Sequence, residues 1–325
     1  MLIGNSYSKS VGLFIGLLLA CSSVIADEAM TWIQTMSNAM QNLNYRGTFV
    51  YMHENQLETM SISHVRNASG EKERLLSLNG EAREVIRDDK NLTCIWPSSR
   101  KVVVDFSRQN RYSPIFIPED ISRLAKYYKV KMLGQGRIAG QIAQVLHIKP
   151  LDEFRYGMKF WISEENGLMM KSALINEHGV MVEQVMFTHL ELIPEEERIL
   201  DTIIPGLDDG YILIRYHSGN TTVSLEGDPA WQLNQIPAGF WQESSIKRPI
   251  PGTEEFVQQL IFTDGLASFS VFIEKSGNLM HKQLTSMGAV NAYIHMYKDF
   301  SVTAIGEVPA VTVKFVAEAM SYNKP

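Results

Sequence analysis

Cysteine is scarce in this chain of 325 residues, which contains only Cys21 and Cys94. Cys21 lies within the first 26 residues, a segment with the features of a cleaved secretion signal, so Cys94 alone remains in the mature chain. No disulfide can then form within it. An exported protein without disulfides depends on burial of a hydrophobic core, and a chain of roughly 300 residues is long enough for one.

Long hydrophobic runs are also missing. The longest, residues 11–20, is about ten residues long, whereas a membrane-spanning helix needs roughly 20. Lys9 precedes the run, and Val24 and Ala26 occupy the −3 and −1 positions of a cleavage site before Asp27. This pattern predicts a signal peptide over residues 1–26 and export to the cell envelope.

A second interpretation of the same segment stays open. Leu18, Leu19, Ala20 and Cys21 resemble the lipobox of bacterial lipoproteins, in which the cysteine becomes the lipidated first residue. The competing site at Val24 and Ala26 favours simple cleavage. Intact mass of the mature chain separates the two, because a diacylated Cys21 and an unmodified Asp27 differ greatly in mass.

Positive charge is not in excess. The chain has 30 basic and 36 acidic residues, a net charge of −6, and loss of Lys9 with the signal peptide leaves 29 and 36, a net charge of −7. An acidic chain of this kind is poorly suited to an electrostatic grip on nucleic acid. We therefore expect no nucleic-acid partner.

Catalytic and metal-binding motifs are missing as well. Gly134, Gly136 and Ala139 match the spacing of a dinucleotide fingerprint, but residues 141–148 alternate like a strand where that fingerprint needs a helix. The eight histidines lack ligand spacing, no G-x-S-x-G elbow is present, and Cys94 has no partner at ligand spacing. We expect no enzyme, no metal and no cofactor, and a hydrolase assembled from scattered residues is the weakest alternative.

The mature chain begins with an amphipathic pattern and continues with short strands. Ile33, Met36, Met40 and Leu43 fall on one face of a predicted helix. The following segments are β-branched and aromatic and are separated by tight turns, which indicates an antiparallel meander. The predicted strands are Arg46–Met52, Leu57–Val65, Glu73–Leu78, Glu84–Arg87, Thr93–Trp96, Lys101–Phe106, Tyr128–Leu133, Ala143–Ile148, Met158–Ile162, Leu168–Ile175 and Val180–Leu192.

Three further features complete the organisation. A second helix is predicted to open at Pro118. Residues 194–220 hold an acidic cluster, proline and glycine with little regular pattern, and we interpret them as a linker between an amino-terminal domain, residues 27–193, and a smaller one, residues 221–325. The smaller domain has an α+β layout, in which strands flank a turn at residues 264–265 and a helix begins at Pro309.

Two features of the composition indicate a binding surface. Methionine is abundant, with 16 in the chain, and its flexible side chain suits apolar or variable partners, although an ordinary methionine-rich core fits equally well. Aromatic residues recur on successive predicted strands, where they either line an apolar groove or fill a packed core. These residues are Phe49, Tyr51, Trp96, Phe106, Phe160 and Trp161.

A series of short motifs in a fixed order resembles the RseB/MucB family of periplasmic regulators of the envelope-stress sigma factor. The resemblance runs from about residue 28 to residue 320, and Asn79 departs from it where an aspartate is commoner. The motifs are Tyr45-Arg-Gly-Thr-Phe-Val-Tyr51, Ser63-His-Val65, Glu73-Arg-Leu-Leu76, Leu78-Asn-Gly80, Arg83-Glu-Val-Ile-Arg87, Gly136-Arg-Ile-Ala-Gly140, Arg155-Tyr-Gly157, Phe160-Trp161, Gly167-Leu168, Lys171-Ser172, Glu183-Gln184, Pro237-Ala-Gly-Phe240, Thr263-Asp-Gly-Leu-Ala-Ser-Phe-Ser-Val271 and Gly306-Glu-Val-Pro309.

The resemblance implies a fold and a function. The fold is α+β, with a large unclosed antiparallel β-barrel wrapped on helices, similar to periplasmic lipoprotein carriers, followed by a smaller α+β domain. The function is negative regulation of the envelope stress response: the protein binds the periplasmic part of a membrane-embedded anti-sigma factor of the RseA/MucA type and protects it from proteolysis. Lipopolysaccharide or another lipid would compete and release it.

The individual contact residues are inferred from the sequence pattern. We expect acyl chains to enter the meander at Phe49, Tyr51, Trp96, Phe106 and Phe160. We expect the anti-sigma segment to contact Phe262, Asp264, Gly265, Phe269, Arg155 and Tyr156. The alternative function is a periplasmic lipid or lipoprotein carrier, which would have no need of residues 221–325, and the oligomeric state stays open, a homodimer included.

Overall fold

The structure is a computed structural model that describes residues 28–68, 70–89, 91–105, 121–194, 204–206, 209–216, 230–249, 255–275 and 282–323. The predicted signal peptide, Phe106 and Pro118 lie outside these ranges. The described part is mostly β, with few helices. None of the described helices is long and apolar enough to cross a bilayer.

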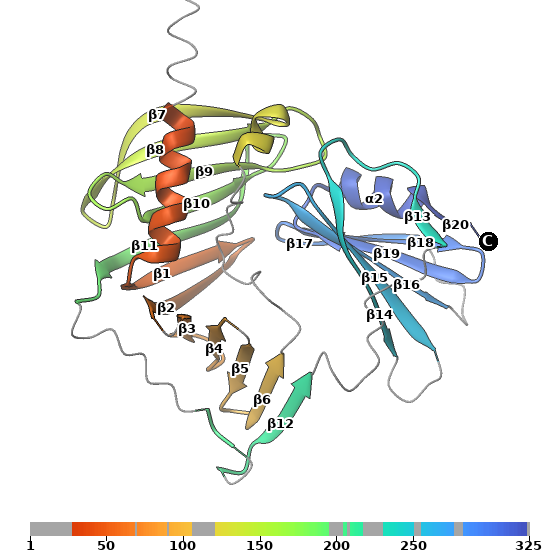
Figure 1. Ribbon diagram of the computed structural model, residues 1–325, viewed down its shortest axis with the longest axis horizontal. Coiled ribbons are helices and arrows are strands. Elements are labelled where there is room, and N and C mark those ends of the chain that lie inside the picture. The colour runs from red at the N-terminus through yellow and green to blue at the C-terminus, as the bar shows by residue number, and fades with distance from the viewer. Residues whose placement is uncertain are drawn as a thin grey trace, which may run out of the picture.

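The chain first forms the predicted amphipathic helix, residues 28–42. Ile33 and Met36 are fully buried on the face that the sequence predicts, and Met40 and Leu43 pack at its edge. The helix lies across one face of a large sheet (Figure 1). We call this the inner face of the sheet and the opposite one the outer face.

The large sheet is open and has twelve strands in the order β12-β6-β5-β4-β3-β2-β1-β11-β10-β9-β8-β7. Neighbours are antiparallel except β12 and β6, which run parallel, and β12 and β7 are its two edges, so no barrel closes. Its strands are β1 (Tyr45–His53), β2 (Gln56–Asn67), β3 (Gly70–Ser77), β4 (Glu84–Asp88), β5 (Leu92–Trp96), β6 (Lys101–Asp105), β7 (Tyr128–Ile138), β8 (Gln141–Pro150), β9 (Gly157–Ser163), β10 (Met169–Ile175), β11 (Met181–Leu192) and β12 (Ile212–Tyr216).

A second, smaller sheet follows, with the order β14-β15-β16-β19-β18-β17, and β13 pairs with β20 beside it. Helix α2 (Ala310–Ala319) covers this sheet through Val313, Val316 and Ala317, as the sequence predicts for a closing helix after Pro309. The strands are β13 (Trp231–Leu233), β14 (Trp241–Pro249), β15 (Phe256–Thr263), β16 (Ser268–Lys275), β17 (Gln283–Met287), β18 (Val290–Tyr297), β19 (Phe300–Gly306) and β20 (Met320–Tyr322).

Two local predictions differ from the structure. Residues 194–220 are predicted to have little regular structure, but β12 lies within them and adds to the edge of the large sheet through β6. Its Leu213 and the preceding Tyr211 pack on a small core with Val102, and this burial holds the segment. Near the expected second helix, the described residues form only a short 3₁₀ helix, η1 (Ile121–Lys126).

Candidate functional site

The two sheets contact one another through the turn between β15 and β16. Asp264 begins this turn, and its Oδ1 accepts hydrogen bonds from the backbone N–H groups of Leu266, at 2.8 Å, and Ala267, at 2.7 Å. An aspartate that folds its own turn in this way holds its second oxygen in a fixed direction. That oxygen, Oδ2, faces the large sheet, where it accepts from Tyr128 Oη at 2.7 Å and from Arg155 Nη1 at 2.5 Å.

Arg155 lies on the large-sheet side of this contact, and all three nitrogens of its guanidinium donate hydrogen bonds. Nε donates to Asp152 Oδ1 at 3.0 Å, and Nη2 donates to the carbonyl oxygen of Ala238 at 2.5 Å. The guanidinium carbon also lies 4.8 Å from the ring centre of Phe240 and 5.2 Å from that of Tyr127. A planar guanidinium suits such a site because it donates in its plane and stacks on rings with its faces.

Burial decides the energetics of this pair. The side chains of Arg155 and Asp264 have no solvent exposure, and a buried charge is tolerated only when it is paired and hydrogen-bonded. Burial and the adjacent Asp264 carboxylate raise the pKa of Tyr128, so its phenol stays protonated and donates. We call Tyr128, Asp152, Arg155, Ala238 and Asp264 the Arg155 centre.

A second group of contacts flanks the Arg155 centre. Asn291 of β18 is buried, and its Nδ2 donates to Tyr156 Oη at 2.9 Å and to the carbonyl oxygen of Val308 at 2.8 Å. On α2, Thr312 Oγ1 donates to the carbonyl oxygen of Phe154 at 2.8 Å. Residues 152–156, which link β8 to β9, therefore touch both the turn after β15 and the helix of the smaller sheet.

Replacement of Asn291 by alanine is expected to destabilise the chain by about 1–3 kcal/mol, because Tyr156 Oη and the Val308 carbonyl lose a buried donor. Chemical unfolding of the full mature chain measures this loss. The matched control is Asn234→Ala, at an exposed position, for which we expect little change. Equal stability of the two variants would contradict the role given to Asn291.

A third contact joins the tip of the β17–β18 hairpin to the large sheet. The N–H of Gly288 donates to Glu54 Oε1 at 2.6 Å, and the N–H of Ala289 donates to Glu183 Oε1 at 3.1 Å. Tyr51 Oη donates to the other oxygen of Glu183 at 3.0 Å. Burial first, and then Glu183, raise the pKa of Tyr51. One of the predicted lipid-site residues thus takes part in the contact between the sheets.

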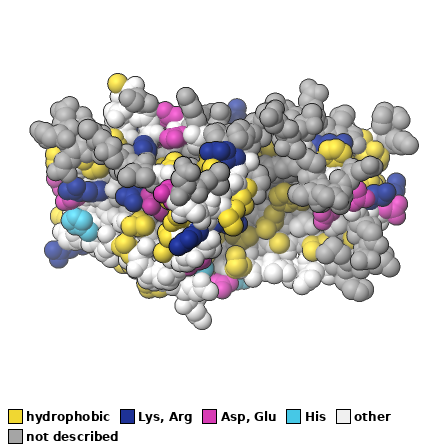
Figure 2. Space-filling view, turned by 90° about the horizontal axis from the view of Figure 1, so that it is seen from below, with side chains coloured by type: hydrophobic (Ala, Val, Ile, Leu, Met, Phe, Trp, Pro, Cys, Tyr) yellow, Lys and Arg dark blue, Asp and Glu magenta, His cyan; other side chains and the backbone are white. Residues whose placement is uncertain are grey.

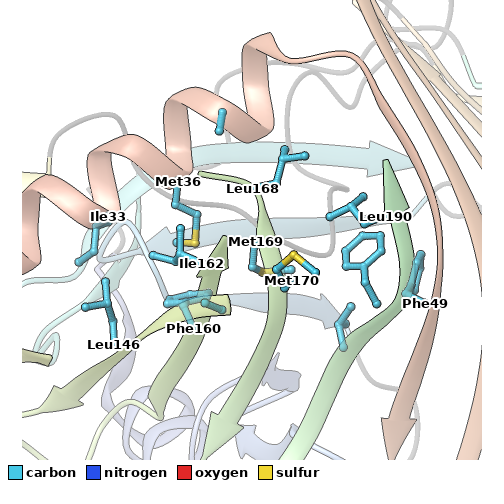
Figure 3. Packing of buried hydrophobic residues seen from close by; sticks show 14 of the residues in the cluster. Ile33, Met36, Phe49, Leu146, Phe160, Ile162, Leu168, Met169, Met170 and Leu190 are labelled. Carbon is cyan, nitrogen blue, oxygen red and sulfur yellow. The ribbon is translucent and has the colours of Figure 1, made fainter. Parts of the chain in front are cut away.

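The inner face of the large sheet carries the main apolar core. Phe49 and Phe160 belong to it and are 3% and 1% exposed. Phe160 lies near Ile33 and Met36 of the amino-terminal helix, whereas Phe49 lies beside Leu190, farther along the sheet (Figure 3). Figure 3 shows these side chains together with Met169 and Met170, whose thioethers lie between the helix and the strands, as expected of adaptable side chains. Tyr51, which is also predicted to belong to the lipid site, is partly buried and packs against the same cluster.

A buried polar cluster interrupts this apolar face between Phe49 and Trp96. His64 of β2 is buried, and its Nδ1 lies 2.9 Å from the carbonyl oxygen of Leu43. Glu73 of β3 is buried beside Arg87 of β4, 3.4 Å away, and burial raises the pKa of its carboxyl. Trp96 lies beyond this cluster on β5, half-buried, with the Lys101 amine 5.7 Å from its ring.

The structure thus groups the predicted site residues in a way that the sequence does not specify. Phe49 and Phe160 belong to one apolar core and Tyr51 packs against it, Trp96 lies apart, and Phe106 is outside the described residues. Phe262 and Phe269 stack in the core of the smaller sheet, with ring centres 5.1 Å apart. Between the two cores, in the middle of the face seen in Figure 2, hydrophobic side chains gather along a hollow.

The sequence pattern predicts Arg155, Tyr156, Asp264 and Gly265 as contact residues but does not indicate that Arg155 and Asp264 pair with each other. It misses Tyr128, which is predicted only as a strand residue, and also Phe154, Asn291 and Thr312. Within the described ranges, no three His, Cys, Asp or Glu side chains are placed to hold a metal. The arrangement is that of a buried, hydrogen-bonded contact between the two sheets.

Two family models match consecutive parts of the chain. The MucB/RseB N-terminal domain matches residues 28–202, and the MucB/RseB C-terminal domain matches residues 226–321. The curated protein "Sigma factor AlgU regulatory protein MucB" of Pseudomonas aeruginosa is 32% identical over 320 residues, which are 95% of this chain and 96% of that protein. "Sigma-E factor regulatory protein RseB" of Haemophilus influenzae is 26% identical over 322 residues, 97% of this chain and 98% of that protein.

Solved structures are similar over nearly the whole chain. The crystal structure of MucB in complex with MucA(peri) has a TM-score of 0.69 at 27% identity and covers 91% of this chain and 100% of that one. The crystal structure of MucB has a TM-score of 0.59 at 27% identity and covers 91% of this chain and 98% of that one. The TM-score is therefore higher against MucB in the MucA(peri) complex than against MucB alone.

Proposed function

The chain belongs to the MucB/RseB family, and on this premise we propose that it binds the periplasmic part of a membrane-embedded anti-sigma factor and protects it from regulated proteolysis. It acts in the periplasm as a negative regulator of a sigma-E type envelope stress response and catalyses no reaction. The observation that carries this proposal is the extent of the likeness, which includes residues 226–321 as well as residues 28–202.

The anti-sigma segment binds along the contact between the sheets, against Phe262, Asp264, Gly265, Phe269, Arg155 and Tyr156 or the backbone that they hold. Because the Phe262 and Phe269 rings are buried, they shape this surface from beneath. Arg155 and Asp264 act as positioning residues, because they form a buried ion pair in which each neutralises the charge of the other. The closer superposition on the MucA(peri) complex than on MucB alone supports a binding-competent arrangement held by the Arg155 centre.

Lipid acts at the inner face of the large sheet. We propose that this sheet and its helices form an unclosed, carrier-like barrel, in which acyl chains reach Phe49, Tyr51, Trp96, Phe106 and Phe160. Lipopolysaccharide or another acylated ligand can release the anti-sigma factor only if it binds the free form more tightly than the complex. Tyr51 supplies a physical link, because its hydroxyl bonds Glu183, which also accepts from Ala289 of the smaller sheet.

We propose a separate role for each domain. Residues 27–193 sense lipid, residues 221–325 bind the anti-sigma factor, and residues 194–220 connect them. A periplasmic lipid or lipoprotein carrier is the alternative, and it requires only the first of these parts. The Arg155 centre favours the regulator, because a carrier has no need of a buried ion pair that fixes a second domain.

The proposal is tested with the purified mature chain, the periplasmic segment of an anti-sigma factor from the same organism and the protease that cuts it. At about ten times the dissociation constant we expect cleavage to slow about tenfold, because only the free segment is cut. Size-exclusion chromatography of the mixture measures complex formation directly. If the chain leaves cleavage unchanged and instead captures lipoproteins from envelope extract, the carrier function replaces the regulator.

A further inference from the structure

The outer face of the large sheet carries a dense group of lysines on β7, β8, β9 and β10. The register places Lys129 opposite Lys149, and it places His147 between Lys131 and Lys159. Because side chains alternate between the two faces of a strand, these residues share one face. We call the group the lysine face, and its five lysines are Lys129, Lys131, Lys149, Lys159 and Lys171.

The charges of the lysine face are not neutralised within the described chain. No described carboxylate lies within 4.0 Å of any of the five amines, and the one contact found is that of the Lys171 amine, 4.6 Å from the ring centre of Trp161. Burial and three lysines, Lys159, Lys149 and Lys131, lower the pKa of His147. A concentrated positive potential on a chain of net charge −6 indicates a partner of opposite charge.

The presence of lysine in place of arginine on this face indicates which class of anionic partner it binds. All five cations are lysines, which act as flexible point charges, whereas fixed recognition of a single carboxylate or phosphate group favours the planar fork of arginine. The lysine side chains project from the outer face of the sheet. Half-buried Trp161 lies among them, beside Gly136 and Val145. Lysines around a tryptophan are typical of a surface that rests on lipid headgroups, where the indole settles at the boundary of water and acyl chains.

We propose that the lysine face docks the protein on the anionic phospholipid surface of a membrane. The choice of a membrane rests on the proposed function, which places the partner of this chain in a lipid bilayer. Docking would confine the protein to the plane in which the anti-sigma segment emerges. It would also leave the inner face and the Arg155 centre free, because the lysine face lies on the opposite side of the large sheet from the amino-terminal helix.

The test measures sedimentation of the full mature chain with vesicles of phosphatidylglycerol mixed into phosphatidylcholine. Each lysine near an anionic surface contributes about fivefold to binding, so Lys129→Gln/Lys131→Gln/Lys149→Gln is expected to weaken binding about a hundredfold. These three lysines are exposed, so the triple variant should fold normally. Added salt should weaken wild-type binding as well, and vesicles of phosphatidylcholine alone should bind poorly.

Two controls keep the result interpretable. Lys101→Gln/Lys275→Gln/Lys314→Gln removes the same charge from exposed positions elsewhere and should bind like the wild type. Lys129→Arg/Lys131→Arg/Lys149→Arg keeps the charge and should retain binding, so it separates lost charge from damaged structure. The proposal is overturned if the glutamine triple variant sediments with vesicles like the wild type. If that variant also loses affinity for the anti-sigma segment, the lysine face contacts the segment and not the membrane. Failure of the proposed function would appear separately, as absent binding of that segment in lipid-free solution.

Discussion

Replacement of Arg155 by alanine is expected to destabilise the contact between the sheets by about 3–5 kcal/mol, because it leaves the Asp264 carboxylate buried without its counter-charge. The same change also removes the donor to the Ala238 carbonyl and the cation that packs against Phe240. Few single substitutions lower the free energy of unfolding by this much, and those that do act through a specific physical defect such as an unpaired buried charge.

Calorimetry of the full mature chain measures this loss, and we expect one transition to separate into two as the sheets uncouple. The matched control is Arg137→Ala, an exposed arginine of β7, whose Nε donates to the carbonyl oxygen of Gly140 at 3.3 Å in solvent. For the control we expect a change within about 0.5 kcal/mol. An Arg155→Ala protein that melts like the wild type would show that the ion pair does not hold the sheets.

A double-mutant cycle separates the pair from the packing around it. Asp264→Asn keeps the oxygen that folds its turn but removes the charge. Because the neutral amide no longer requires a cation, we expect Arg155→Met to cost less in this background than in the wild type. If the two losses simply add, Arg155 acts through its packing on Phe240 and through Asp152, which lies 3.0 Å away.

The functional consequence follows from the proposed binding-competent arrangement. When only a fraction of the molecules holds the sheets together, the measured affinity for the anti-sigma segment falls by that fraction. Arg155→Ala should therefore bind the segment more weakly, with a loss that shrinks as temperature is lowered below its first transition. Unchanged affinity in a destabilised variant would leave the Arg155 centre a structural contact and place the binding surface elsewhere.

Much of the fold can be predicted from the sequence because the local signals are strong. Alternating strands such as residues 45–49 bury every second side chain, and the apolar positions of the first helix all fall on one face. The predicted strands Leu168–Ile175 and Val180–Leu192 correspond to β10 and β11, which pair antiparallel. In the strand and the helix, the apolar positions that identify the element in the sequence are the positions that become buried in the structure.

The elements that the sequence misses lack this signal. β17 is an edge strand exposed along its length, and β14 is a polar edge strand, so neither alternates between buried and exposed positions. β12 adds parallel to β6 from more than a hundred residues away. The pairing of Arg155 with Asp264 spans 109 residues, and no periodicity in one segment indicates which distant charge it will meet.

The lipid-site prediction depends on how the sheet is covered. Aromatic residues on successive strands fit a groove or a packed core equally well, and the sequence leaves both open. In the structure, Phe160 packs near Ile33 and Met36 of the amino-terminal helix, and Phe49 packs on Phe187 in the same cluster. This part of the face is therefore a packed core. An acyl chain can reach Phe160 only by taking the place of Ile33 and Met36, and lipid binding would then require the helix to move.

A reversible clamp on this helix is expected to abolish lipid binding at the inner face. A Cβ added at Gly167 lies 3.3 Å from Cβ of Ala39 on the helix, close to the separation of about 3.5–4.5 Å found in disulfides. It also lies 2.8 Å from Cγ2 of Thr35, so the Thr35 side chain must shift to admit it. Ala39→Cys/Gly167→Cys, with Cys94→Ser to prevent mispairing, should therefore oxidise to a bridge. Gly167 has a φ of +78°, so its replacement costs about 1–2 kcal/mol, which the bridge offsets by restraining the unfolded chain.

The oxidised and reduced forms of this one protein are matched controls for each other. Fluorescence of an acyl-chain probe should show strong binding after reduction and little after oxidation, while both forms bind the anti-sigma segment equally, because the Arg155 centre is untouched. Lipid should accordingly release the segment only from the reduced form, since a ligand that cannot enter the free protein cannot shift the equilibrium. Equal probe binding in the two forms would show that acyl chains bind without displacing the helix, and Phe49 and Phe160 would then be core residues alone.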